Sequence, residues 1–210
     1  MAKYKRVVTP EGIAHYPWLS KPDTKFDKNG TFSCNVFIDI EKAKPIMKMI
    51  NDEIDEFHAA EEKSSNKKLE RNILPYIEHG DPRDTQKVIP QGSVMFKIKQ
   101  NGVIGDKPFR PQLVDSEGTP MVDKNGDNIV VYGGSKVKVA FDLYTYNNLK
   151  VGVTLKLVAV QVLELQDAGT PDLSKLGFKK EDGFKMADEI TTMKDTTSAQ
   201  KEEISNSDFI

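Results

Sequence analysis

Aromatic side chains occur together with lysine or arginine in three stretches of this sequence that we expect to be extended. The stretches hold Tyr16, Trp18, Lys21, Lys25 and Phe26, then Phe109 and Arg110, and finally Tyr144, Tyr146 and Lys150, while Lys97 and Lys99 add cations on a further predicted strand. A flat ring can stack on an unpaired nucleobase, and a cation can hold the neighbouring phosphate. These residue types therefore predict binding of a single-stranded nucleic acid rather than catalysis.

Each aromatic side chain also has a structural interpretation, which the sequence leaves open. Trp18 is the only tryptophan, and most tryptophans are largely buried, so it is either a stacking platform or a core anchor. Tyr144 and Tyr146 are either stacking residues or edge residues of an ordinary hairpin, because aromatics are enriched in strands generally.

Catalytic and metal-binding patterns are missing from the sequence. It contains no glycine-rich phosphate loop, HExxH, GxSxG or CxxC motif. Cys34 alternates with apolar residues and is expected to be a small core residue. The 123–127 stretch, DKNGD, lacks the spacing and the bidentate acid of an EF-hand. We therefore expect a protein that is not an enzyme and that uses no cofactor and no metal.

Two long strands joined by a polar turn, over 134–165, are the strongest structural signal. Apolar residues alternate in the first strand and become nearly continuous in the second from Leu157, which predicts burial on both faces there. Further strands are expected over 4–8, 31–39, 93–99 and 128–132, with extended segments over 12–25 and 107–115. Three- and four-residue apolar spacing predicts one long helix at about 41–60. A loop insertion follows over 61–90, with at best a short helix near 67–72.

Composition bounds the class of protein. No apolar run approaches the roughly 20 residues that span a bilayer, so no membrane association is expected. The chain carries a net charge of −2, and residues 187–210 alone carry −4, so the remainder carries +2. We expect one domain over 1–166, a linker over 167–186 and a flexible acidic tail over 187–210. A slightly basic body with an acidic tail is one charge arrangement of nucleic-acid-binding proteins.

The segments YPWLSKPDTKF, GTFSCNVFID, SVMFKIKQ, GDKPFRPQLVD and GGSKVKVAFDLYTYNN, with the closing strand KVGVTLKLVAVQVLEL, resemble the phage single-stranded DNA-binding proteins of podovirus-type replication systems. The resemblance covers about residues 6–166. It implies a mainly β protein with an OB-fold, a five-stranded barrel elaborated by one helix and extended loops. It also implies coating of single-stranded DNA during replication, recombination and repair, in the cytoplasm of the infected bacterial host.

The resemblance further implies that the acidic tail, ending in Asp208, Phe209 and Ile210, contacts the phage DNA polymerase and helicase-primase and competes with DNA. The acids of this tail are spread among Ser, Thr and Lys, a departure from the strongest form of that pattern. Whether the chain forms a homodimer is left open. The competing hypothesis is a phage structural or assembly β-barrel without a nucleic-acid role, and a third hypothesis is a metal-dependent nuclease.

Overall fold

The structure is a computed structural model, and it describes residues 5–166. Its elements, in chain order, are β1 (Lys5–Val8), β2 (Gly12–Asp23), β3 (Thr31–Asp39), α1 (Ile40–Ser65), β4 (Tyr76–Glu78), β5 (Ser93–Asn101), β6 (Val103–Ile104), β7 (Lys107–Pro108), β8 (Gln112–Val114), β9 (Lys136–Asn147) and β10 (Val151–Glu164). The predicted linker over 167–186 and the predicted acidic tail over 187–210 lie outside the described residues.

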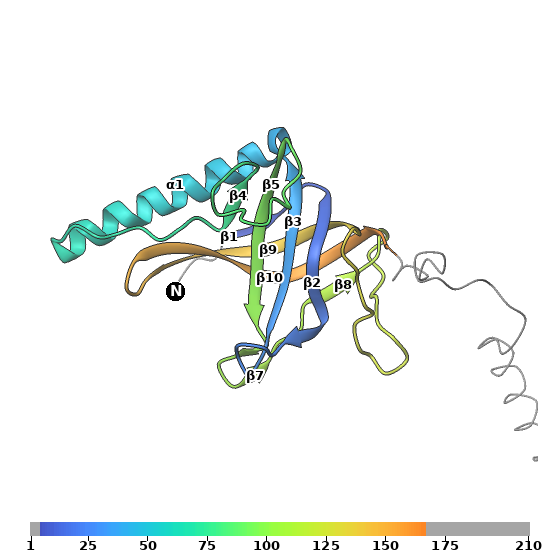
Figure 1. The fold of residues 1–210 in the computed structure, drawn as a ribbon. Coiled ribbons are helices and arrows are strands. Elements are labelled where there is room, and N and C mark those ends of the chain that lie inside the picture. The colour runs from blue at the N-terminus through green and yellow to red at the C-terminus, as the bar shows by residue number, and fades with distance from the viewer. Residues whose placement is uncertain (1–4, 167–210) are drawn as a thin grey trace, which may run out of the picture. The chain divides into compact units, whose positions relative to one another are not determined.

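Five strands close into a barrel in the order β2, β3, β5, β10, β9 and back to β2 (Figure 1). All of these neighbours are antiparallel except β5 and β10, which run parallel with Leu155 opposite Ile98. This is the closed five-stranded arrangement of an OB-fold, so the predicted fold class is confirmed. Strands β1, β4 and β8 extend the sheet beside β9, β5 and β10.

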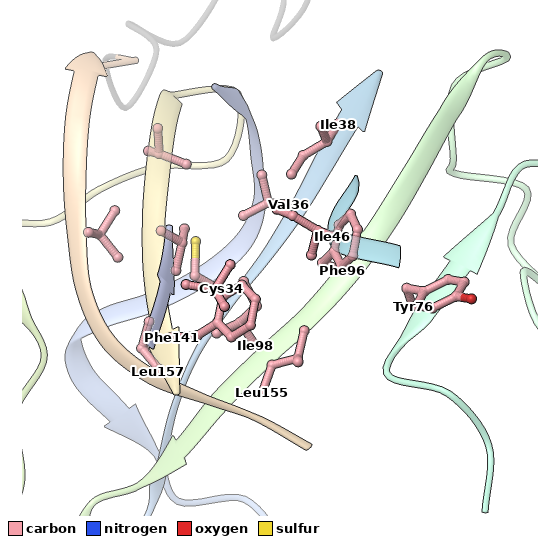
Figure 2. Close-up of a cluster of buried hydrophobic side chains, with 14 of the residues drawn as sticks. Cys34, Val36, Ile38, Ile46, Tyr76, Phe96, Ile98, Phe141, Leu155 and Leu157 are labelled. Carbon is pink, nitrogen blue, oxygen red and sulfur yellow. The ribbon is translucent and has the colours of Figure 1, made fainter. Parts of the chain in front are cut away.

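The barrel interior is filled by the alternating apolar residues that predicted the strands. β3 contributes Phe32, Cys34, Val36 and Ile38, and β9 contributes Val137, Val139, Phe141 and Leu143. Figure 2 shows Cys34, Val36, Ile38 and Phe141 of this set. Cys34 is fully buried, and this burial raises the pKa of its thiol to about 12, as expected of a core residue. Strand β10 differs from its prediction: Leu157 and Val160 are buried, but Val158 and Leu163 are only half-buried. Its second face is therefore only partly covered.

Helix α1 packs one apolar stripe, Ala43, Ile46, Ile50 and Ile54, against the barrel. The carboxylate of Asp39 caps its first turn by accepting from the backbone N–H of Glu41 at 2.9 Å. The helix runs beyond the predicted 41–60 to Ser65 and is capped by Asn66, whose φ of 50° is left-handed. In Figure 1 its last turns run alongside the β9–β10 hairpin. No helix in the part of the chain that the structure describes is long and apolar enough to cross a membrane.

The 61–90 insertion is more ordered than its sequence predicts. The short helix expected near 67–72 is absent from these described residues, and Arg71 instead forms a bridge to Val151. A strand that was not predicted, β4, pairs with β5. The prediction of a strand over 128–132 is also wrong, because in that segment only Asn128 forms a β-bridge, with Val122.

Candidate nucleic-acid interface

A bulge in β2 decides which of its aromatic residues face solvent. Gly12 and Ala14 are buried, so strict alternation would bury the side chains at 16 and 18 as well. The pairing with β3 shifts between His15 and Trp18, and Tyr16 within this shift has a φ of 47°. Beyond it the alternation is reversed: Leu19 is buried and Trp18 is 47% exposed. Trp18 is therefore not a core anchor.

Three adjoining hollows run along this strand, and we call them together the β2 groove. The middle one, of about 390 Å³, lies between Tyr16, Trp18 and the 130–133 segment. It shares Ser20, Lys21 and Val130 with a larger hollow of about 760 Å³, which Phe109 and Arg110 also line. It shares Tyr16 with a smaller one of about 220 Å³, which Lys97 lines. The groove thus brings together six predicted residues: Tyr16, Trp18, Lys21, Lys97, Phe109 and Arg110.

The charge of the groove is mixed. Within the described chain, the amino groups of Lys21 and Lys97 form no hydrogen bond or ion pair. Arg110 is already engaged, because its guanidinium donates to Asp127 Oδ1 at 2.7 Å and to the carbonyl of Gly126 at 2.9 Å. Asp123 lines the groove as well, and its pKa is lowered by backbone N–H donors, first that of Asp127. A ligand phosphate therefore meets two lysines without an ion pair, although Lys97 is attracted by the Asp81 carboxylate and helps to lower its pKa, and it has to compete for Arg110.

A row of side chains leads from Trp18 across the outward face of the barrel. Trp18 lies opposite Ser33 in β3, Ser33 lies opposite Lys99 in β5, and Lys99 lies opposite Lys156 in β10. The Lys156 ammonium sits 4.1 Å from the ring centroid of Tyr144 in β9, a cation–π contact. The sheet thereby links the predicted residues Lys99 and Tyr144 to the groove.

The β9–β10 hairpin also holds Tyr146 and Lys150, which belong to the same predicted stretch as Tyr144. The phenolic oxygen of Tyr146 accepts from the Asn72 amide at 2.7 Å. A Cβ on Gly152 would lie only 2.4 Å from Cζ and the phenolic oxygen of Tyr146, so the end of this ring occupies the space that a side chain at position 152 would take. Lys150 pairs with Glu70 at 2.7 Å, and this contact lowers the pKa of the Glu70 carboxyl. Tyr146 and Lys150 are thus both bonded to side chains of the 66–72 segment.

Lys25 and Phe26 occupy the turn between β2 and β3. Phe26 is 90% exposed, and the Lys25 ammonium lies 5.3 Å from its ring centroid. OB-folds bind oligonucleotides on the face of their second and third barrel strands and on the loops joining strands one to two and four to five. In this chain those places are the β3–β5 face, the 24–30 turn and the 148–150 turn, where Lys97, Lys99, Lys25, Phe26 and Lys150 lie.

Sequence reasoning missed several residues of this surface. Val130 and Tyr132 line the groove but fall outside every aromatic and basic stretch. Asn128 is buried and donates to the carbonyls of Leu19 at 3.0 Å and Pro111 at 2.8 Å, which ties the two walls of the groove together. Lys156 is the one basic residue of β10, and that charge between two apolar neighbours was the available signal. No cluster of three or more metal-ligating side chains occurs within residues 5–166.

Comparison with known proteins places the chain in a family. A family model described as the ssDNA-binding protein of Enterobacter phage Enc34 matches residues 5–192. The chain belongs to this family. The predicted recognition of a phage single-stranded DNA-binding protein is thereby confirmed, and the role of the family is not enzymatic. No curated protein sequence matches the chain significantly.

Solved structures support the same fold. The single-stranded DNA-binding protein gp2.5 of bacteriophage T7 superposes with a TM-score of 0.67 at 24% identity, over 87% of this chain and 99% of that one. The C-terminally truncated Enc34 protein gives a TM-score of 0.55 at 16% identity, over 77% and 87%. The Enc34 protein in complex with ssDNA gives 0.55 at 15% identity, over 77% and 88%.

Proposed function

We propose that this member of the Enc34 ssDNA-binding family binds single-stranded DNA without sequence preference, along the β2 groove and across the β3–β5 face. The observation that carries the proposal is the bulge at Tyr16, which turns Tyr16 and Trp18 out of the core and into a groove shared with Lys21 and Lys97. Burial in the core does not explain the placement of these two rings, because Tyr16 is 66% exposed and Trp18 is 47% exposed, so they need another role. Stacking on unpaired bases provides one.

The proposed contacts have an expected energy and an expected salt dependence. Each base that stacks on an aromatic side chain contributes about 1–3 kcal/mol, whatever its identity, because every base has a π face. Lys21, Lys97 and Lys99 would neutralise phosphates and release counterions, so log affinity should fall linearly with log salt. Single strands give a slope of about −0.7 for each neutralised phosphate.

The test is a titration of fluorescently labelled oligo-dT, followed by anisotropy, from low to high salt. Binding that weakens linearly on the log–log plot is the expected result. The competing structural or assembly protein predicts no binding at any salt concentration. An EDTA control addresses the nuclease hypothesis, since only that hypothesis predicts metal-dependent cleavage of the oligonucleotide.

We further propose the cellular role that the sequence resemblance implies. The protein coats single-stranded DNA during phage replication, recombination and repair in the cytoplasm of the infected bacterial host. Its C-terminal residues Asp208, Phe209 and Ile210 contact the phage polymerase and helicase-primase. Support comes from the family and from the charge of residues 187–210, six acids and two lysines. Light scattering of the purified chain tests for the homodimer.

A further inference from the structure

The outward face of β3 and β5 is covered over only part of its length. Ile77, Ile89 and Met95 form a small buried cluster with Phe37 and Val88, by which the 79–92 segment is packed onto the barrel. The covered part ends at the register pair Phe37–Met95. The next outward pair, Asn35 and Lys97, lines an open hollow. The 79–92 segment therefore forms a wall at one end of the open face.

This wall is held in place by its own polar contacts. The Asp84 carboxylate accepts from the backbone N–H groups of Val88 and Ile89, both at 3.1 Å. Arg83 donates to Asp81 at 2.6 Å and to the carbonyl of Tyr76 at 3.2 Å. The Arg83 side chain is the first cause that lowers the pKa of Asp81 to about 2, so this pair stays charged. The wall is thus formed before any ligand arrives.

The hollow beside the wall is lined by polar side chains that a ligand could bind. Its volume is about 220 Å³, and it lies between Tyr16, Asn35 and Lys97 on one side and Arg83, Thr85 and Gln86 on the other. Among residues 5–166, the side chains of Asn35, Gln86 and Lys97 form no hydrogen bond or ion pair, and Lys97 is attracted only by the nearby Asp81 carboxylate. An amide can donate to and accept from the edge of a base, and an ammonium can hold a phosphate.

The ring at the mouth of this hollow is held by a strained backbone. Tyr16 is 66% exposed, and its left-handed φ of 47° is unfavourable for any residue with a Cβ. Its ring centroid lies 4.3 Å from that of His15, which in turn lies 4.7 Å from that of Phe37. These two tilted ring contacts connect the Tyr16 ring, through His15, to Phe37 of the wall cluster. Strained residues that surrounding structure holds in place are typical of ligand clamps.

We propose that this hollow is the terminal subsite of the DNA path and takes a single unpaired nucleotide. The base stacks on Tyr16, the amides of Asn35 and Gln86 meet its edge, and Lys97 holds its phosphate. The 79–92 wall prevents the DNA from continuing over the β3–β5 face, so the bound DNA strand ends or turns away there. The subsite rests on the proposed single-stranded DNA binding and gives the path a fixed end.

Photo-cross-linking tests the position of the subsite. The shortest oligo-dT that reaches full affinity is made with a single 5-iodo-deoxyuridine at each position in turn. We expect one terminal position to cross-link to Tyr16 or to the 81–88 peptide, and internal positions to cross-link to Trp18. Cross-links to Trp18 without any to Tyr16 or 81–88, or cross-links to 81–88 from every position, would overturn the subsite alone. Failure of the wild-type chain to bind the oligonucleotide would overturn the proposed function itself.

Two variants test the contribution of the subsite to affinity. Tyr16→Gly removes the ring but suits the left-handed backbone, so its melting temperature should not fall. It should lose about 5-fold to 150-fold in affinity for the shortest full-affinity oligonucleotide, the equivalent of ~1–3 kcal/mol. Gln86→Ala should lose less, in the same direction. Both should match wild type once that oligonucleotide is shortened by its terminal nucleotide.

The matched control is Gln112→Ala, which removes an exposed glutamine that lines none of the three hollows. It should bind every oligonucleotide as wild type does. An equal loss at all lengths for Tyr16→Gly and Gln86→Ala would show that the hollow has no terminal role. Unchanged affinity in both variants would show that it takes no nucleotide.

Discussion

At the scale of single residues, the conformation of Tyr16 sets the chemistry of β2. One left-handed residue reverses the alternation of the strand, buries Leu19 and exposes Trp18. A sequence pattern of period two assumes an uninterrupted strand, so it cannot reveal this reversal. The position of Trp18 was therefore undecided by sequence and is decided by the structure.

Trp18 provides the first prediction. Because its indole is half-exposed, the free protein should emit at the longer wavelengths of a solvated tryptophan, and stacking on added oligo-dT should quench that emission. Trp18 is the only tryptophan, so the signal has one source. Trp18→Phe, which keeps a ring, should lose less affinity than Trp18→Ala. If saturating oligo-dT leaves the emission unchanged, Trp18 does not contact the bound DNA.

Cys34 provides a prediction about the core. Its thiol is fully buried, and with a pKa of about 12 it holds almost no thiolate at pH 8. A thiol reagent such as DTNB should therefore react only as fast as the barrel opens, and at full rate in denaturant. Fast stoichiometric labelling under native conditions would contradict the described core.

At the scale of elements, the β9–β10 hairpin is fastened to the insertion that follows α1. Tyr146 has both a ring on Gly152 and a hydroxyl bonded to Asn72, so its two roles can be separated. Tyr146→Phe should keep the affinity for oligo-dT, whereas Tyr146→Ala and Tyr144→Ala should each lose about 5-fold or more, roughly 1 kcal/mol or more. Circular dichroism should be unchanged in all three. Equal affinity of the double alanine variant and wild type would exclude the hairpin from the interface.

The Arg110–Asp127 pair predicts a gain of affinity. Asp127 occupies the guanidinium at 2.7 Å and adds negative charge to the groove. Asp127→Asn should therefore bind oligo-dT several-fold more tightly at low salt, by about 1 kcal/mol, with the gain fading as salt screens the charge. Glu56→Gln changes the net charge equally but lies exposed on α1, away from the groove, and should have little effect. Weaker binding by Asp127→Asn would mean that the pair positions Arg110 for DNA.

At the scale of the whole molecule, the sequence predicted the strands well and the site only in pieces. Alternating apolar residues located β3, β5, β9 and β10, because each has one face in the barrel. The closure of the barrel came from family resemblance, since β5–β10 pairing joins residues that are distant in sequence. The groove could not be predicted, because its second wall is irregular and is tied to β2 by one buried side chain, that of Asn128. The predicted site residues are consequently divided among the groove, the β3–β5 face with Lys99, the β2–β3 turn and the β9–β10 hairpin.

The last prediction concerns the C-terminal residues, which lie outside the described part of the chain. Residues 187–210 carry a net charge of −4 and end in Asp208, Phe209 and Ile210, and the rest of the chain carries +2. An acidic segment tethered to a body of opposite net charge has a high effective concentration at the lysines of that body and competes with phosphates, most strongly at low salt. A chain ending at Met186 should therefore bind single-stranded DNA more tightly than the full-length chain, with a difference that shrinks as salt rises.

The same truncation tests the docking role of the tail independently. An aromatic residue beside an acid offers an apolar anchor to a basic pocket on a replication partner. In a pull-down, the full-length chain should therefore retain the phage polymerase, and the chain ending at Met186 should not. Full-length variants Phe209→Ala and Asp208→Asn separate the ring from the charge: the first should weaken the pull-down while leaving the low-salt affinity for DNA unchanged. Equal DNA affinity of the truncated and full-length chains at low salt would remove the competition model, and retained polymerase would remove the docking role.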